Sequence, residues 1–198
     1  MKVLSLFPSL MHLDAVKEFA KIKDKLIQFA YQEKEKDPKG KVISGLGSWQ
    51  SNDHYANYAN PISSAITIIL GNMLTNTKIF KVNKKLVVSG MWININRPGD
   101  SNTKHIHACC DLSGILWIKQ PNKGGNIQFE SPHAFSHCNQ VNAYTSDFLQ
   151  SYYTGPAMEI VPLEGNILIF PSSTYHMVLP NCSKEDRISA SFNMEIQP

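Results

Sequence analysis

The sequence lacks any apolar run approaching the roughly 18 residues that a membrane-spanning helix needs. It also lacks a marked excess of one charge, because 19 basic and 16 acidic side chains leave a net charge of +3. The basic residues form no stripe along a helix, so the charge pattern gives no indication of a nucleic-acid partner. We therefore expect a cytoplasmic protein that acts on neither membranes nor nucleic acids.

The chain has only four cysteines, and two of them, Cys109 and Cys110, are adjacent. None has the CxxC spacing of a zinc or redox site, so we expect free thiols in a reducing compartment. The apolar start of the chain, Met1–Phe7, is followed directly by Pro8 and has no clear cleavage site. We expect a first β-strand there rather than a signal peptide.

A chain of 198 residues is long enough to bury a sizeable core, and we expect one domain over residues 1–198. Within residues 1–85 we expect helices that support this core. Apolar residues recur at spacings of three or four from Val16 to Phe29, and Asn60-Pro61 is typical of a helix start. Between the two helices we expect a polar loop over Gly45–Tyr58.

Residues 86–198 show short β-rich runs separated by turns. The eight expected strands are Leu86–Asn96, Lys104–Cys109, Gly114–Lys119, Asn126–Phe129, Met158–Pro162, Asn166–Phe170, Tyr175–Leu179 and Arg187–Glu195. Strands of this length and spacing predict a mainly β fold with flanking helices, arranged as a cupin-like jelly roll. A polar and aromatic loop at residues 131–156 has the size of a substrate-binding element, and equally of a homodimer contact.

The histidines divide into two sets. His105 and His107 are two residues apart in a predicted strand, so both side chains are expected on one face. His176 and Arg187 lie on two later strands and can approach the same point. Two or three imidazoles with a guanidinium nearby indicate a metal site that also binds a carboxylate. The other histidines, His12, His54, His133 and His137, are given no role.

Two of the expected strands alternate between polar and apolar residues, which places the polar residues of each strand on one face. These positions are Arg187, Ser189, Ser191 and Asn193 on the last strand, and Trp92, Asn94 and Asn96 on the strand before the histidine pair. If the apolar faces pack in the core, the polar faces line either a cavity or the surface. A guanidinium and a hydroxyl two residues apart, as in Arg187 and Ser189, can bind one carboxylate together.

Several segments carry a resemblance to a known family when they are taken in order. They are Gly47–Ser51, Trp92–Asn96, His105–His107, Ser113–Trp117, Pro162–Pro171, His176 and Arg187–Asn193. This order resembles the Fe(II)- and 2-oxoglutarate-dependent oxygenases, and more narrowly an oxygenase family common in marine bacteria and their phages. The resemblance implies a double-stranded β-helix and, if a phage encodes the chain, a location in the host cytoplasm.

The resemblance also implies roles for individual residues. His105 and His176 would bind Fe(II), and Arg187 with Ser189 would bind the far carboxylate of 2-oxoglutarate; we assign Asn94 to the same co-substrate site. The implied reaction consumes O₂ and 2-oxoglutarate, releases succinate and CO₂, and hydroxylates a C–H bond. The substrate is then a small molecule or a peptide, with prolyl hydroxylation one example.

The sequence departs from the wider superfamily at His107, where most members have Asp or Glu. Three interpretations follow: His107 is the third metal ligand, Asp111 supplies a carboxylate instead, or water fills that position. We favour His107, because neutral imidazole is a good ligand for Fe(II) and the spacing from His105 fits.

Two other functions are open on the sequence alone. One is a cupin-like metal-dependent dioxygenase that does not use 2-oxoglutarate, although the Arg187-x-Ser189 pattern argues against it. The other is a non-catalytic jelly roll that binds or builds structure, with incidental histidines. A zinc hydrolase is not favoured, because no HExxH pattern occurs.

Overall fold

A computed structural model describes residue 3 and residues 8–54, 60–76, 84–133 and 143–198 of the chain. The described strands are β1 (His12–Ala15), β2 (Gly45–Leu46), β3 (Trp49–Gln50), β4 (Lys85–Asn96), β5 (Ser101–His105), β6 (Leu112–Lys119), β7 (Ile127–Glu130), β8 (Ala157–Ile160), β9 (Asn166–Pro171), β10 (His176–Val178) and β11 (Arg187–Gln197). The helices are a 3₁₀ turn (Phe19–Lys21), α1 (Lys23–Lys36), α2 (Pro61–Asn76) and α3 (Ser146–Ser151). None of these helices is long and apolar enough to span a membrane.

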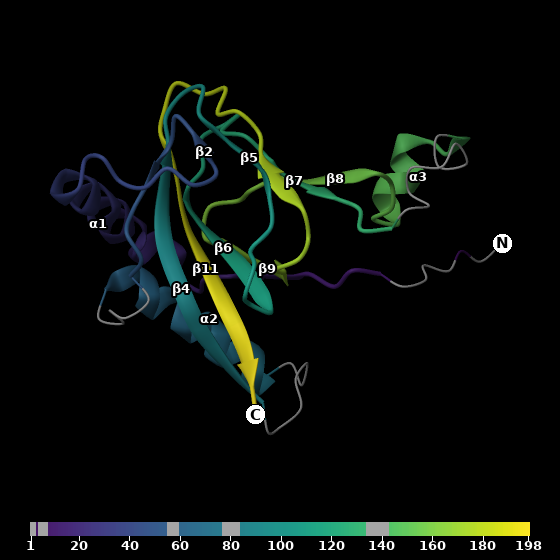
Figure 1. Cartoon of the computed structure of the whole chain (residues 1–198), viewed down its shortest axis with the longest axis horizontal. Helices are drawn as coiled ribbons and strands as arrows, with labels where there is room; N and C mark the ends of the chain where they lie inside the picture. The colour runs from purple at the N-terminus through teal and green to yellow at the C-terminus, as the bar shows by residue number, and fades with distance from the viewer. Residues whose placement is uncertain (1–2, 4–7, 55–59, 77–83, 134–142) are drawn as a thin grey trace.

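The strands form two antiparallel sheets. The larger sheet has the order β1-β9-β6-β11-β4-β3, and the smaller sheet has the order β2-β5-β10-β7-β8. Long strands β4 and β11 run side by side in the larger sheet, with α1 and α2 beside it, while α3 projects at the far end beyond β8 (Figure 1). This is the mainly β architecture with flanking helices that the sequence predicts.

The strict alternation of β4 and β11 separates the two faces of the larger sheet. One face presents Ile93, Ile95, Ile188 and Phe192, which are fully buried in the main hydrophobic cluster with side chains from α1 and α2. The opposite face contributes a second, smaller cluster, where β6 and β9 of the larger sheet pack against β7 of the smaller one. The polar positions of β4 and β11 also lie on this inner face, beside the second cluster.

Most of the predicted elements are confirmed. Seven of the eight predicted strands have nearly the predicted ends, and α2 begins at Pro61 as expected. The side chain of Asn60 caps that helix, because its Oδ1 accepts a hydrogen bond from the Ser63 backbone N–H at 2.8 Å. The helix predicted from Val16 is present but begins at Lys23, after the 3₁₀ turn.

Three predictions about local structure are wrong. The strand predicted over Lys104–Cys109 runs instead over Ser101–His105, so His107 lies beyond its end. The loop predicted over Gly45–Tyr58 contains the short strands β2 and β3, which local pattern does not reveal because their partners are distant in sequence. The loop predicted at residues 131–156 contains α3.

Some predictions concern residues that the structure does not describe. The predicted first strand, Met1–Phe7, lies outside the described residues except for residue 3, and β1 follows it at His12–Ala15. The same holds for residues 134–142 of the long loop, including His137, and for residues 55–59.

Candidate active site

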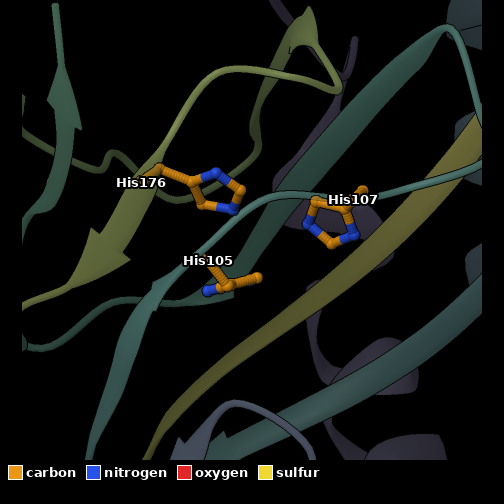
Figure 2. Close-up of side chains that lie close together, drawn as sticks. All are labelled: His105, His107 and His176. Atoms are coloured by element: carbon orange, nitrogen blue, oxygen red, sulfur yellow. The ribbon is translucent and has the colours of Figure 1, made fainter.

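Three histidines converge between the two sheets. His105 ends β5 and pairs with His176 of the neighbouring strand β10. His107 follows two residues later, where its backbone N–H donates to the Ser172 carbonyl at 3.0 Å. One ring nitrogen from each histidine lies within 4.8 Å of the others, and Figure 2 shows the three rings facing one space.

Backbone carbonyls fix which ring nitrogen of two histidines faces the cluster. His105 Nδ1 lies 2.7 Å from the Thr103 carbonyl, and His176 Nδ1 lies 2.9 Å from the Thr174 carbonyl. Because a carbonyl oxygen only accepts, both Nδ1 atoms carry the proton and donate it. In the neutral form of each ring, Nε2 is then the nitrogen with the free lone pair, which is the form that binds a metal ion.

Burial keeps two of the imidazoles neutral. It lowers the pKa of His107 to about 3, with a further lowering from the charges that His176 and His105 would carry. It also lowers the pKa of His176 to about 4, against a smaller opposing effect of the Thr174 carbonyl and with a further lowering from His105. At neutral pH both rings are uncharged, so a cation does not compete with protons for these nitrogens.

Arg187 lies on the same inner face and is the largest polar side chain buried there. It is only 1% exposed, and its Nε and Nη1 atoms have no hydrogen-bond partner among the described residues. Burial lowers its pKa to about 10, so the guanidinium is still charged at neutral pH. No described carboxylate forms an ion pair with it, although a buried charge is costly without one.

Further unsatisfied donors lie next to Arg187. Ser189 Oγ and Trp117 Nε1 are buried without a partner among the described residues, and their residues pair across β11 and β6. Asn94 pairs with Ser189 from the other side, and its Nδ2 donates to Ser191 Oγ at 3.0 Å. This concentration of donors around a fixed positive charge fits a carboxylate ligand.

The histidines and Arg187 open onto one cavity of about 350 Å³. Its polar lining includes Asn94, Ser189, Ser191 and Asn193, and its apolar lining includes Ile115, Ile127, Phe170 and Val178. The prediction that the polar faces of β4 and β11 line a cavity or the surface is thus resolved in favour of a cavity. A pocket of this size and mixed lining suits a small ligand.

The other sequence candidates lie elsewhere. Asp111 is not part of the histidine cluster; its Oδ2 accepts the Ile196 backbone N–H at 2.7 Å, where β6 begins beside the end of β11. His54 lies beside Glu33 of α1, at 3.6 Å between Nε2 and Oε2. Two residues of this region, Trp117 and Asp53, are not among the predicted site residues. The indole of Trp117 is buried beside Ser189, and Asp53 lines the cavity.

Fold and site together define a class of protein: a jelly roll with a three-histidine cluster that shares a cavity with a buried guanidinium. A family model described as "Putative 2OG-Fe(II) oxygenase" matches residues 90–193, more than half of the chain. The chain belongs to this family and is a 2-oxoglutarate- and Fe(II)-dependent oxygenase. No curated protein sequence matches it.

Solved structures with the same fold are distant in sequence. A prolyl-4-hydroxylase from Pseudomonas putida is 14% identical, with a TM-score of 0.62 over 96% of this chain and 94% of that one. A viral collagen prolyl hydroxylase from Paramecium bursaria Chlorella virus-1 is 16% identical, with a TM-score of 0.59 over 93% and 94%. The carbocyclase SnoK from nogalamycin biosynthesis is 14% identical, with a TM-score of 0.64 over 94% and 79%. These matches confirm the double-stranded β-helix.

Proposed function

We propose that the chain hydroxylates a C–H bond of a small molecule or a peptide, with Fe(II) bound by His105, His107 and His176. The single observation that carries the co-substrate assignment is Arg187, a buried cation without an acidic partner among the described residues, on the cavity that the three histidines share. An oxygenase that uses a dicarboxylate requires such a residue, and a structural jelly roll does not.

The donor set fits the two groups that the family uses. Three imidazole nitrogens suit Fe(II). Arg187 and Ser189 would hold the far carboxylate of 2-oxoglutarate, the guanidinium through its N–H groups and the hydroxyl through its O–H. Asn94 lies next to Ser189 on the same face. When bound, iron and 2-oxoglutarate supply the oxidising chemistry, with succinate and CO₂ as the products of the co-substrate.

The protein's own contribution is orientation and the exclusion of water. The Thr103 and Thr174 carbonyls fix two of the imidazole rings, so the ligand nitrogens are in place before a metal binds. The apolar wall of Ile115, Ile127 and Phe170 borders the cavity and limits the water that reaches the reacting centre. No side chain needs to act as a general base in this reaction.

One part of this proposal is specific to the chain: a metal site of three histidines, in place of the more usual two histidines and a carboxylate. It is supported by the convergence of the three ring nitrogens and by the engagement of Asp111 with the Ile196 backbone. The substrate is not selected by the fold, because the similar structures include two prolyl hydroxylases and a carbocyclase.

An anaerobic titration tests the proposal. Metal-free protein is titrated with Fe(II) and then with 2-oxoglutarate, and the visible charge-transfer band of the chelate is recorded. We expect a saturable band in the wild type and in Arg97→Met, which removes the chain's other arginine, a side chain that is 60% exposed. In Arg187→Met we expect iron binding to persist while the band requires at least tenfold more 2-oxoglutarate, since one charge-assisted, hydrogen-bonded contact is lost.

The alternatives give different results in the same titration. Iron binding without a band at any 2-oxoglutarate concentration would support a cupin-like dioxygenase that does not use the co-substrate. Absence of iron binding would support a non-catalytic jelly roll. An unchanged 2-oxoglutarate requirement in Arg187→Met would show that the co-substrate assignment is wrong.

A further inference from the structure

The cavity extends along β4 and β11 away from Arg187, to the level of the histidines. Strands β4 and β11 run along it, with Arg187 near one end and Asn193, which pairs with Gly90, near the other. Trp92 lies between these ends and packs against His107, with 5.6 Å between the ring centroids. The end at Asn193 is therefore the part of the cavity that a substrate can use while Arg187 holds a co-substrate.

Asp53 supplies a carboxylate at this second end. It lines the cavity together with Asn193. A β-carbon on Gly90 would lie 3.2 Å from Asp53 Oδ2 and 4.0 Å from Asn193 Nδ2, so Gly90 marks the space that these two polar groups border. The Asn193 side chain is held in place, because its Oδ1 accepts a hydrogen bond from Ser113 Oγ at 3.0 Å.

The segment that carries Asp53 is attached to the edge of β4. Its carboxylate Oδ1 accepts the Met91 backbone N–H at 2.9 Å. On either side, the Ser51 N–H donates to the Ile93 carbonyl at 2.9 Å and the His54 N–H donates to the Met91 carbonyl at 2.7 Å. These bonds continue the pairing of β3 with β4, so the carboxylate has a fixed position relative to the histidines.

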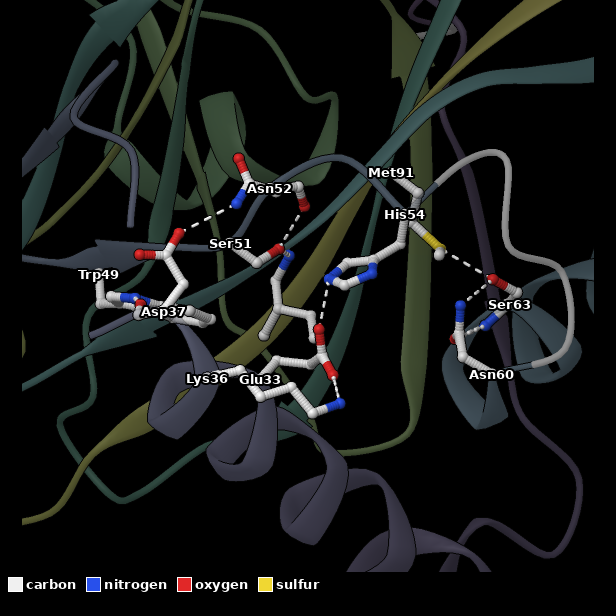
Figure 3. Close-up of polar contacts among 11 residues, drawn as sticks. Glu33, Lys36, Asp37, Trp49, Ser51, Asn52, His54, Asn60, Ser63 and Met91 are labelled. Atoms are coloured by element: carbon white, nitrogen blue, oxygen red, sulfur yellow. Dashed lines mark hydrogen bonds and ion pairs between the residues drawn. The ribbon is translucent and has the colours of Figure 1, made fainter. Parts of the chain in front are cut away.

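Helix α1 supports the same segment from its other side (Figure 3). Asn52 Nδ2 donates to Asp37 Oδ2 at 2.9 Å, and the Trp49 indole N–H donates to the Asp37 carbonyl at 2.8 Å. His54 faces Glu33, at 3.6 Å between Nε2 and Oε2. A carboxylate held on both flanks in this way is preorganised, which reduces the entropy lost when it binds a ligand.

The charges of the cavity are separated between its two ends. Among its described lining residues, Lys41 pairs with Gln50, which in turn pairs with Asn94 beside Ser189, so Lys41 belongs to the end near Arg187. Asp53 lies at the opposite end. Among the described lining residues, the Lys41 and Arg187 cations thus lie toward one end and the Asp53 carboxylate lies toward the other.

We propose that Asp53, with Asn193 beside it, selects substrates that carry a protonated amine or a guanidinium on an aliphatic chain. The carboxylate accepts hydrogen bonds from such a group. Ile106, between the two histidines of the His105–His107 segment, lines the same cavity and is 40% exposed, which gives the aliphatic part an apolar contact. This proposal rests on the proposed function, because it assigns the substrate end of that site.

The test compares two probes of the same shape, n-butylguanidinium and n-butylurea, one charged and one neutral. Each is titrated into the anaerobic complex of protein, Fe(II) and 2-oxoglutarate, and the shift of the charge-transfer band reports binding near the metal. We expect the guanidinium to bind about fivefold more tightly than the urea, the upper range for an exposed ion pair, because Asp53 is itself exposed. Asp53→Asn, whose Oδ1 still accepts the Met91 N–H, should reduce this preference to about one.

Two further variants complete the test. Asp14→Asn makes the same charge change on β1, outside the lining of this cavity, and should keep the wild-type preference. Gly90→Ala places a methyl group next to Asp53 Oδ2 and should weaken guanidinium binding. Equal responses to the two probes in the wild type, including no response, or a preference that survives in Asp53→Asn, would overturn the proposal. Failure of the band itself would instead contradict the proposed function.

Discussion

Strands β4 and β11 contribute side chains to two faces of the larger sheet. The faces differ in whether they bury polar groups that lack a hydrogen-bond partner within the described part of the chain. On the outer face, Ile93, Ile188 and Phe192 are fully buried against helices α1 and α2. These side chains have no polar atoms, so burial needs no partner for them, and their contribution is packing and removal of apolar surface from water.

Near Arg187 the inner face is buried to the same degree but contains hydrogen-bond donors. Arg187 and Ser189 are each 1% exposed, as inaccessible as Ile93 on the other side. Their side-chain donors lack acceptors among the described residues, and leaving such groups unpaired costs stability. Burial therefore does not separate core from site in this protein, whereas the balance of hydrogen bonds does.

The largest expected effect comes from the inner face and leaves the fold intact. We expect His107→Ala to weaken Fe(II) binding by more than about 100-fold, because even residues behind metal ligands account for 10- to 100-fold. The free energy of unfolding should change by no more than about 1 kcal/mol. Anaerobic Fe(II) titration with parallel denaturant unfolding measures both. Asp111→Ala is the control and should retain iron; if it lost iron while His107→Ala kept it, the three-histidine site would be wrong.

On the outer face the pattern should reverse. We expect Phe192→Ala to lower the free energy of unfolding by about 3–5 kcal/mol, because a fully buried ring leaves a cavity. The Phe192 ring covers Gly114 of β6 so closely that a β-carbon on Gly114 would lie 2.2 Å from it. Because Gly114 has no side chain, it cannot fill the gap that the ring leaves. Denaturant unfolding measures the loss, and Tyr153→Ala, at an 81% exposed position, should change stability by less than about 0.5 kcal/mol. Iron affinity of the folded fraction should stay at the wild-type value in both variants.

The sequence predicts this separation of faces well, because a strand alternates with a period of two residues. The polar positions of β11, from Arg187 to Asn193, and those of β4 are visible without any knowledge of the fold. Long-range pairing is not visible in this way. Strands β2 and β3 have two residues each and exist because β5 and β4 provide their hydrogen-bond partners.

The site could be predicted from the sequence only in part, and the positions of His107 and Asp53 show why. The i, i+2 spacing of His105 and His107 predicts that both rings face one point, and they do, although β5 ends at His105. His107 is held instead by the Ser172 carbonyl, a contact between residues far apart in the chain. Asp53 had no signal at all, because an aspartate in a polar loop acquires its place in the cavity through bonds to a distant strand, such as the one from the Met91 N–H.

The smallest expected effect distinguishes the two faces most sharply, because a change that removes function should add stability. We expect Arg187→Met to raise the unfolding free energy of the protein without 2-oxoglutarate by about 1 kcal/mol, since it replaces a buried unpaired charge with an apolar side chain. The midpoint of thermal unfolding should rise by about 2–4 °C. Added 2-oxoglutarate with Fe(II) should stabilise the wild type and have little effect on the variant, because a ligand stabilises only the state that binds it.

Arg97→Met, at an exposed arginine that bonds to the Gly47 carbonyl, should show neither the gain in stability nor the lost response to 2-oxoglutarate. A fall in stability of Arg187→Met without ligand would mean that the guanidinium serves the fold, and the distinction between the faces would then not hold at this position.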